Sequence, residues 1–114
     1  MKNIGLLLVL FLSSIVYGSD INEVLATAAE NGALEEVQEL IDKGAFINAQ
    51  DKWSGTTALM MASKKGHLEV VKYLVEKGAD INQVSRYEKT ALIEASENGH
   101  AGIVKFLKKA GAKE

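Results

Sequence analysis

The chain has 114 residues, of which 47% are hydrophobic and 25% are charged, values typical of one globular domain. It contains no cysteine, which excludes a disulfide framework, a thiol nucleophile, a zinc–thiolate site and a lipid-modified cysteine. The formal net charge is −2, so the composition provides no basic surface typical of nucleic-acid-binding proteins.

The N-terminal segment, MKNIGLLLVLFLSSIVYGSD, has the layout of a secretory signal peptide. One lysine precedes an apolar run, and Val16 and Gly18 are small residues at the two positions that a signal peptidase reads. An uncleaved membrane anchor is the alternative, but Ile4–Tyr17 spans only 14 residues, fewer than the ~18 to 20 that a membrane-spanning helix needs. The sequence therefore predicts a signal peptide at residues 1–18 and a mature domain at residues 19–114.

Two series of glycines indicate an internal repeat. Each glycine of the first series precedes an alanine, and each glycine of the second series follows the shorter apolar segment that it ends. Both series have successive intervals of 34 and 33 residues, and two markers with one period indicate a repeat. The first series is Gly44, Gly78 and Gly111, and the second is Gly32, Gly66 and Gly99.

The glycines divide the mature chain into three units, at about residues 20–55, 56–88 and 89–114. Each unit carries two short apolar-periodic segments, which predicts a pair of helices per unit. In the second unit we expect these helices at Thr57–Ser63 and at Leu68–Lys77. The predicted fold class is therefore all-α, with pairs of helices stacked into a solenoid.

The second helix of each unit carries a narrow apolar stripe, as Val71, Leu74 and Val75 do at i, i+3 and i+4. Gly78 follows the last turn, where a left-handed residue ends a helix without a Cβ clash. In the last unit Lys108 stands where an apolar residue is expected, which suits a terminal unit with a polar outer face.

Small residues recur in the first helices and allow neighbouring units to approach closely. They are Ala26, Ala28 and Ala29, then Ala58, Ala62 and Ser63, then Ala91, Ala95 and Ser96. The connecting loops differ in length, because nine residues separate Asn48 from Thr57 and eight separate Asn82 from Thr90. We therefore expect one additional residue at the tip of the first loop, near Trp53.

Three segments resemble the ankyrin repeat family, whose unit has 33 residues and a T-P-L-H-x-A signature. These segments are Thr57-Ala58-Leu59-Met60-Met61-Ala62, Lys65-Gly66-His67 and Asn98-Gly99-His100. The resemblance implies a solenoid of about three helix-turn-helix units that acts as a non-catalytic protein–protein interaction module. Ala58 and Met60 replace the proline and the histidine of the signature in the second unit. Ala91 and Ile93 replace them in the third. In the family the histidine and the threonine of the signature help to tie the helix start to the neighbouring loop, so the resemblance implies that some rigidity is lost here.

Few residues could carry catalysis or bind a metal. His67 and His100 fall in the same step of the repeat, which favours hydrogen bonding within the turn between helices over metal ligation, since no third ligand accompanies them. Ser63 and Ser96 occupy small-residue core positions without a nucleophile elbow. We therefore expect no catalytic site, no metal site and no cofactor.

The family resemblance implies that the partner contacts the loop tips and the exposed positions of the first helices. Trp53 and Tyr87 belong to residue types that often anchor interfaces when they are exposed. The alternative is that both rings fold back and pack on the stack. The expected tip residues are Lys52, Trp53, Ser54, Arg86, Tyr87 and Glu88; the expected helix positions are Thr27, Met61 and Glu94, with Lys64, Lys65, Glu97 and Asn98 beside them.

Charge is uneven along the chain. Residues 19–55 hold eight acidic and two basic side chains, residues 56–88 hold four and five, and residues 89–114 hold three and five. This gives local net charges of −6, +1 and +2, which could orient a partner or assist head-to-tail self-association.

The resulting hypothesis is an exported bacterial protein, periplasmic or secreted, that binds a protein partner of unknown identity through its concave face. The sequence predicts a monomer that contacts neither nucleic acid nor, after signal cleavage, a membrane. The alternatives are a self-assembling scaffold protein and a membrane-anchored adaptor with an uncleaved leader.

Overall fold

The structure is a computed structural model that describes residues 20–114, so the predicted signal peptide at residues 1–18 and the alternative membrane anchor lie outside it. The described residues contain helices and loops but no strand, as expected for the all-α class. None of the helices within this range is both long and apolar enough to cross a membrane. In chain order the helices are α2 (Ile21–Glu30), α3 (Leu34–Asp42), α4 (Ala58–Lys65), α5 (Leu68–Glu76), α6 (Ala91–Glu97) and α7 (Ala101–Lys109).

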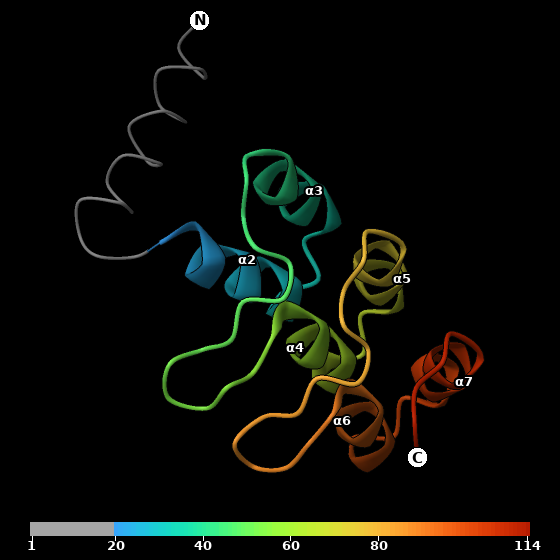
Figure 1. Cartoon of the computed structure of the whole chain (residues 1–114). Helices are drawn as coiled ribbons and strands as arrows, with labels where there is room; N and C mark the ends of the chain where they lie inside the picture. Colours follow the sequence, from blue (N-terminus) through green and yellow to red (C-terminus); the bar gives the residue numbers. More distant parts are fainter. Residues whose placement is uncertain (1–19) are drawn as a thin grey trace, which may run out of the picture.

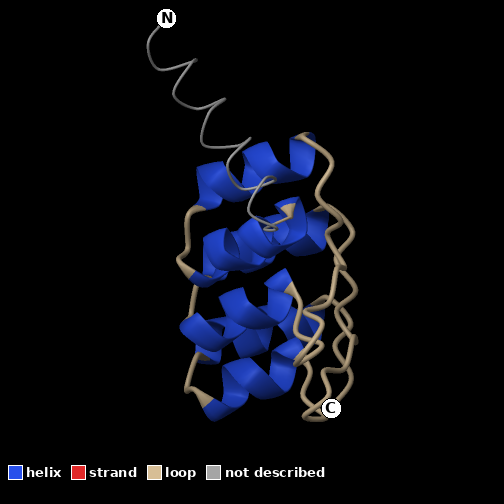
Figure 2. Cartoon of the chain, turned by 90° about the vertical axis from the view of Figure 1, so that its left-hand side faces the viewer, coloured by secondary structure: helices blue, strands red, loops and turns tan. Residues whose placement is uncertain are grey.

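The helices form three stacked pairs, one for each predicted unit. The first helices α2, α4 and α6 pack side by side in one row, and each also packs against the second helix of its own unit, α3, α5 or α7 (Figure 1). The two long loops project from the same side of the stack, so that they run together along one edge (Figure 2). The predicted solenoid of helix pairs is confirmed.

Side-chain caps fix the start of each first helix. The hydroxyl of Thr57 accepts a hydrogen bond from the Met60 N–H at 3.2 Å, and Thr90 caps α6 in the same way. The carboxylate of Asp20 accepts from the Glu23 N–H at 2.9 Å. Such caps satisfy backbone donors that have no partner inside the helix, so these residues determine where the first helices begin.

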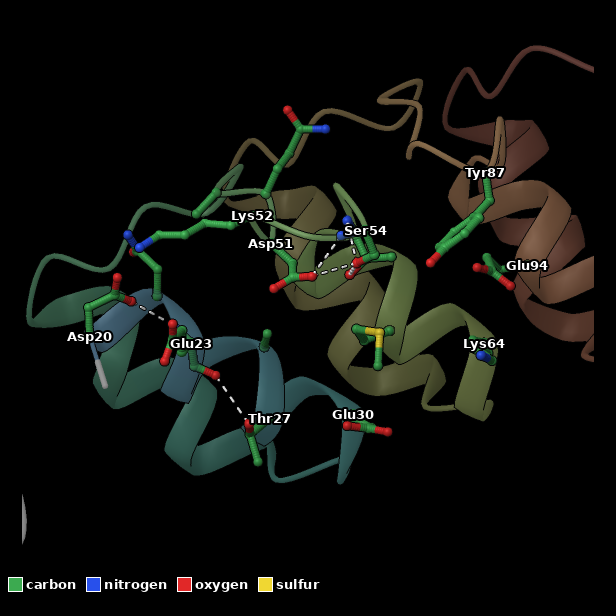
Figure 3. Close-up of a pocket in the computed structure, with 16 residues that line it drawn as sticks. Asp20, Glu23, Thr27, Glu30, Asp51, Lys52, Ser54, Lys64, Tyr87 and Glu94 are labelled. Atoms are coloured by element: carbon green, nitrogen blue, oxygen red, sulfur yellow. Dashed lines mark hydrogen bonds between the residues drawn. The ribbon is translucent and has the colours of Figure 1, made fainter. Parts of the chain in front are cut away.

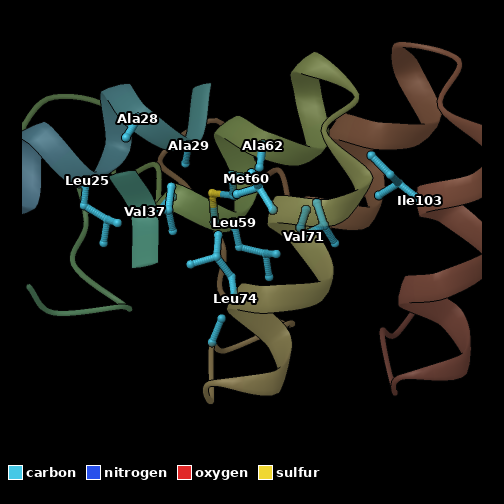
Figure 4. Close-up of a cluster of buried hydrophobic side chains, with 14 of the residues drawn as sticks. Leu25, Ala28, Ala29, Val37, Leu59, Met60, Ala62, Val71, Leu74 and Ile103 are labelled. Atoms are coloured by element: carbon cyan, nitrogen blue, oxygen red, sulfur yellow. The ribbon is translucent and has the colours of Figure 1, made fainter. Parts of the chain in front are cut away.

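The core lies between the two rows of helices (Figure 4). Val71 and Leu74 of the predicted stripe are fully buried, but Val75 is only half-buried. Val70, at 1% exposure, is the third buried residue of this helix. Burial of one such aliphatic side chain contributes about 1.5–3 kcal/mol. Because each helix has only two or three turns, this packing between units stabilises the fold more than helix propensity does.

The small residues of the first helices are buried where another unit covers them. Ala29 and Ser63 occupy equivalent positions and are both fully buried, although the hydroxyl of Ser63 has no hydrogen-bond partner among the described residues. The prediction of a core position was wrong for Ser96, which is exposed. It belongs to the last unit, and no helix of residues 20–114 covers its outer side.

Imidazole rings join each unit to the one before it. The Nε2–H of His67 donates to the Glu30 carbonyl at 2.8 Å, and that of His100 donates to the Lys64 carbonyl at 2.9 Å. The acceptors belong to the preceding unit, so the predicted bond within the turn was wrong. A carbonyl left free at the end of a short helix is thereby satisfied by its neighbour.

A second series of bonds lies on the loop side; two of its members join neighbouring units and one lies within the first unit. Asn48 accepts a hydrogen bond from the Asp80 N–H at 2.7 Å. The side chain of Asn82 accepts in the same way from the Lys113 N–H at 2.9 Å, and Asn22 accepts from the Phe46 N–H at 2.7 Å. In all three pairs the donor directly follows a Gly-Ala pair. These repeated contacts hold the loops in register with the helices.

Candidate protein-binding site

The tips of the two long loops are tight turns that contact each other. In the first turn the Asp51 N–H donates to the Thr56 carbonyl at 2.8 Å, and in the second the Ser85 N–H donates to the Lys89 carbonyl at 2.9 Å. The first turn is longer by one residue, which confirms the predicted additional residue near Trp53. The Arg86 N–H donates to the Ser54 carbonyl at 2.8 Å and links the tips directly.

The carboxylate of Asp51 organises the first tip. It accepts hydrogen bonds from the Ser54 N–H at 2.9 Å and from the Ser54 hydroxyl at 2.7 Å. These bonds favour the charged form and hold the pKa of Asp51 below its usual value, with smaller contributions from the Trp53 backbone and the Arg86 charge. The turn is thus a fixed structure, although it is exposed to solvent.

Trp53 and Tyr87 both lie in solvent. Trp53 is 84% exposed at the first tip, and Tyr87 is 67% exposed at the second. The sequence left open whether these aromatics pack back on the stack, and in the structure neither does. Exposed aromatic rings on neighbouring, linked turns are typical anchors of protein interfaces.

A groove of about 500 Å³ lies between the first helices and the loop tips (Figure 3). Thr27, Met61 and Glu94, which occupy equivalent positions in the three units, all line it. The structure therefore places six predicted binding residues in the groove, in addition to Thr27. These six are Lys52, Ser54, Met61, Lys64, Tyr87 and Glu94.

The other predicted residues lie outside the lining of the groove. Trp53 extends from the tip into solvent, and Glu88 occupies a left-handed turn position with φ 60°. Lys65 forms an ion pair with Glu30 at 3.8 Å. The residues outside the lining are Trp53, Lys65, Arg86, Glu88, Glu97 and Asn98.

Sequence reasoning missed most of the first unit's contribution to the groove. Glu30 stands at the position equivalent to Lys64, so alignment of the units could have found it, whereas Glu23 and Ala26 are equivalent to Thr57 and Met60, which are buried and do not line the groove. Loop residues such as Gln50 carry no comparable signal, because their position depends on how the loop bends over the helices. The missed lining residues are Asp20, Asn22, Glu23, Ala26, Glu30, Ala49, Gln50, Asp51 and Thr56.

The described residues contain no cluster of three or more histidine, aspartate or glutamate side chains placed to hold a metal ion. Both imidazoles use Nε2 in bonds between units. The groove instead offers carboxylates, lysines, hydroxyls and one aromatic ring on a fixed framework.

Comparison with known proteins agrees with the stacked architecture. A family model described as ankyrin repeats (3 copies) matches residues 5–85 and residues 25–114. A comparison with curated proteins finds no match. Because the two matches together cover nearly the whole chain, this protein belongs to the ankyrin repeat family.

Proposed function

We propose that this protein binds a partner protein through the groove and the adjoining loop tips, without catalysing a reaction. Ankyrin repeats are generally protein–protein interaction modules. The observation that carries the proposal for this surface is the exposure of Trp53 and Tyr87 on linked turns beside the groove. Export to a bacterial periplasm or secretion, through residues 1–18, remains part of the proposal.

The surface is preorganised for binding. The side-chain amide of Gln50 donates to the Gly55 carbonyl at 3.0 Å and to the Val84 carbonyl at 3.3 Å, so it bridges both loops. The bond from Arg86 to Ser54 supports the same arrangement. A surface that is already ordered loses less conformational entropy when a partner binds, and exposed aromatics can then contribute their contact area to affinity.

Substitution of both tip aromatics tests this proposal. We expect Trp53→Ala with Tyr87→Ala to weaken capture of the native partner at least ~100-fold, because each truncated anchor typically costs more than about 1–2 kcal/mol. The partner is first identified by cross-linking, and its binding to the purified full chain is then measured. Helical circular dichroism should stay unchanged, since neither ring is packed in the core.

Phe46→Ala provides the matched control. Phe46 is 72% exposed but does not line the groove. Its loss should leave partner binding within about twofold of the unsubstituted chain. Equal binding by the double variant and the unsubstituted chain would show that the partner uses another surface.

A further inference from the structure

Glu94 is an unusual residue within the groove. It lies on α6, only 7% of its surface is exposed, and it is the one acidic residue among the buried polar side chains of residues 20–114. Its carboxylate has no hydrogen bond or ion pair within this range; the Lys89 ammonium binds Glu97 at 2.7 Å and acts on Glu94 only through its charge. Figure 3 shows the Glu94 carboxylate beside the hydroxyl end of Tyr87, directed to the groove.

The fold does not require a carboxylate at this position. The equivalent residue is Met61 in the second unit and Thr27 in the first, and both also line the groove. Removing a charged group from water without a compensating partner is costly. A nearly buried carboxylate that lines the groove and has no hydrogen bond or ion pair within residues 20–114 is therefore better explained by a cationic ligand than by stacking of the units.

The surrounding charge favours a cation. The groove is lined by five acidic side chains and two lysines, a net charge of −3. Within residues 20–114 the carboxylates of Glu23 and Glu94 have no hydrogen-bond partner, whereas those of Asp20 and Asp51 are used in a cap and a turn and that of Glu30 forms an ion pair with Lys65. A concave surface with an excess of one charge raises the local concentration of ligands of the opposite charge.

We propose that the partner segment bound in the groove is basic, and that one lysine or arginine side chain of it occupies the place between Glu94 and Tyr87. This inference rests on the proposed function and adds the chemistry of the partner. The cation forms a charge-assisted hydrogen bond with the Glu94 carboxylate. The methylene stem or the charged group of the partner's lysine or arginine contacts the Tyr87 ring, as cationic side chains commonly do with aromatic faces.

Peptide binding tests the inference directly. The probe is a fluorescent peptide of alternating lysine and alanine, and its control is the same peptide with every lysine acetylated. Binding to the full chain is followed by anisotropy. We expect the lysine peptide to bind and the acetylated peptide to bind at least ~10-fold more weakly, with a difference that shrinks as ionic strength rises above about 0.15 M.

Two variants at the same position separate charge from folding. Glu94→Gln should weaken binding of the lysine peptide about tenfold or more, as expected for loss of a charge-assisted bond. Glu94→Met should do the same and should fold, since Met61 occupies the equivalent position. Glu69→Gln, which removes an exposed charge on α5 outside the groove, should change binding by no more than about twofold.

The result that overturns the inference is distinct from failure of the proposed function. Equal affinity of the two peptides, equal affinity of the Glu94 and Glu69 variants, or no binding of the lysine peptide would each overturn the basic-segment assignment. If loss of Trp53 and Tyr87 still abolished capture of the native partner in those cases, the groove would remain a protein-binding site with a different chemistry. If neither experiment showed binding, both proposals would be wrong.

Discussion

Gly32, Gly66 and Gly99 share one conformational requirement but differ in their surroundings. All three have positive φ angles, of 73°, 85° and 76°. A Cβ on Gly66 would lie 2.6 Å from the His100 ring, and one on Gly32 would lie 2.5 Å from the His67 ring. A Cβ on Gly99 would meet nothing within 4 Å. Two of the glycines therefore also make room for the next unit's imidazole.

This difference predicts unequal effects of alanine. Gly66→Ala and Gly99→Ala should each lose about 1–2 kcal/mol of unfolding free energy from the left-handed backbone. Gly66→Ala should lose about a further 1–3 kcal/mol, because the methyl group displaces the His100 ring and its bond to the Lys64 carbonyl. Urea unfolding of both variants measures the difference. Equal losses would contradict the role of Gly66 in the contact between units.

At the scale of single elements, the first loop tip depends on a charged group. The pKa of Asp51 is lowered in the folded chain, chiefly by the bond from the Ser54 N–H. A lowered pKa means that the contribution of this carboxylate to stability is present above the pKa of the unfolded chain. It is lost as pH falls through the lowered pKa of the folded chain.

Asp51→Asn should therefore have a pH-dependent effect. At neutral pH we expect the variant to melt at a lower temperature than the unsubstituted chain, because an amide is a weaker acceptor for the Ser54 donors. The difference in melting temperature should narrow as pH falls through the acid range where Asp51 titrates. A difference that is constant with pH would show that the charge of Asp51 does not stabilise the turn.

Elements with local signals could be predicted from the sequence, whereas contacts between units could not. Threonine caps and glycine ends are local features, so the two helices of the second unit were placed to within about two residues. The carbonyl that His67 binds lies 37 residues away, and nothing near the histidine indicates it. The exposure of Ser96 likewise depends on the absence of a covering unit within the described chain.

The candidate site divides in the same way. Met61, Lys64 and Glu94 were predicted because the resemblance to ankyrin repeats implies partner contacts at these positions of the first helices, and all three line the groove. The expectation that Glu94 occupies an exposed position was wrong, since only 7% of its surface is exposed. Pattern alone finds which residues share a face, and packing determines how deeply each one lies.

At the scale of the whole molecule, the two ends of the stack are not complementary. The outer face of α7 carries exposed Lys108, as predicted for a terminal unit, and also exposed Lys105. Gly99 leaves open space where a following imidazole would fit. The first unit has Ala33 where later units have histidine, so a second copy could not supply that ring. Head-to-tail stacking of copies would lack the contact that joins units within the chain.

We therefore expect the chain without residues 1–18 to sediment as a monomer at micromolar concentration. Lys105→Val with Lys108→Val should increase self-association, because the change enlarges an apolar patch beside half-buried Val104. Sedimentation velocity over a range of concentrations measures both. A concentration-dependent oligomer of the unsubstituted chain would instead favour the self-assembling scaffold.

The central claim is that a partner protein occupies the groove, and site-specific photo-crosslinking tests it most directly. A photo-reactive residue at Met61, in the groove, is compared with one at Lys72, which is exposed on α5 outside the groove. We predict a specific cross-link to one partner protein from Met61 and none from Lys72. Cross-links to the same partner from Lys72 alone would contradict the account.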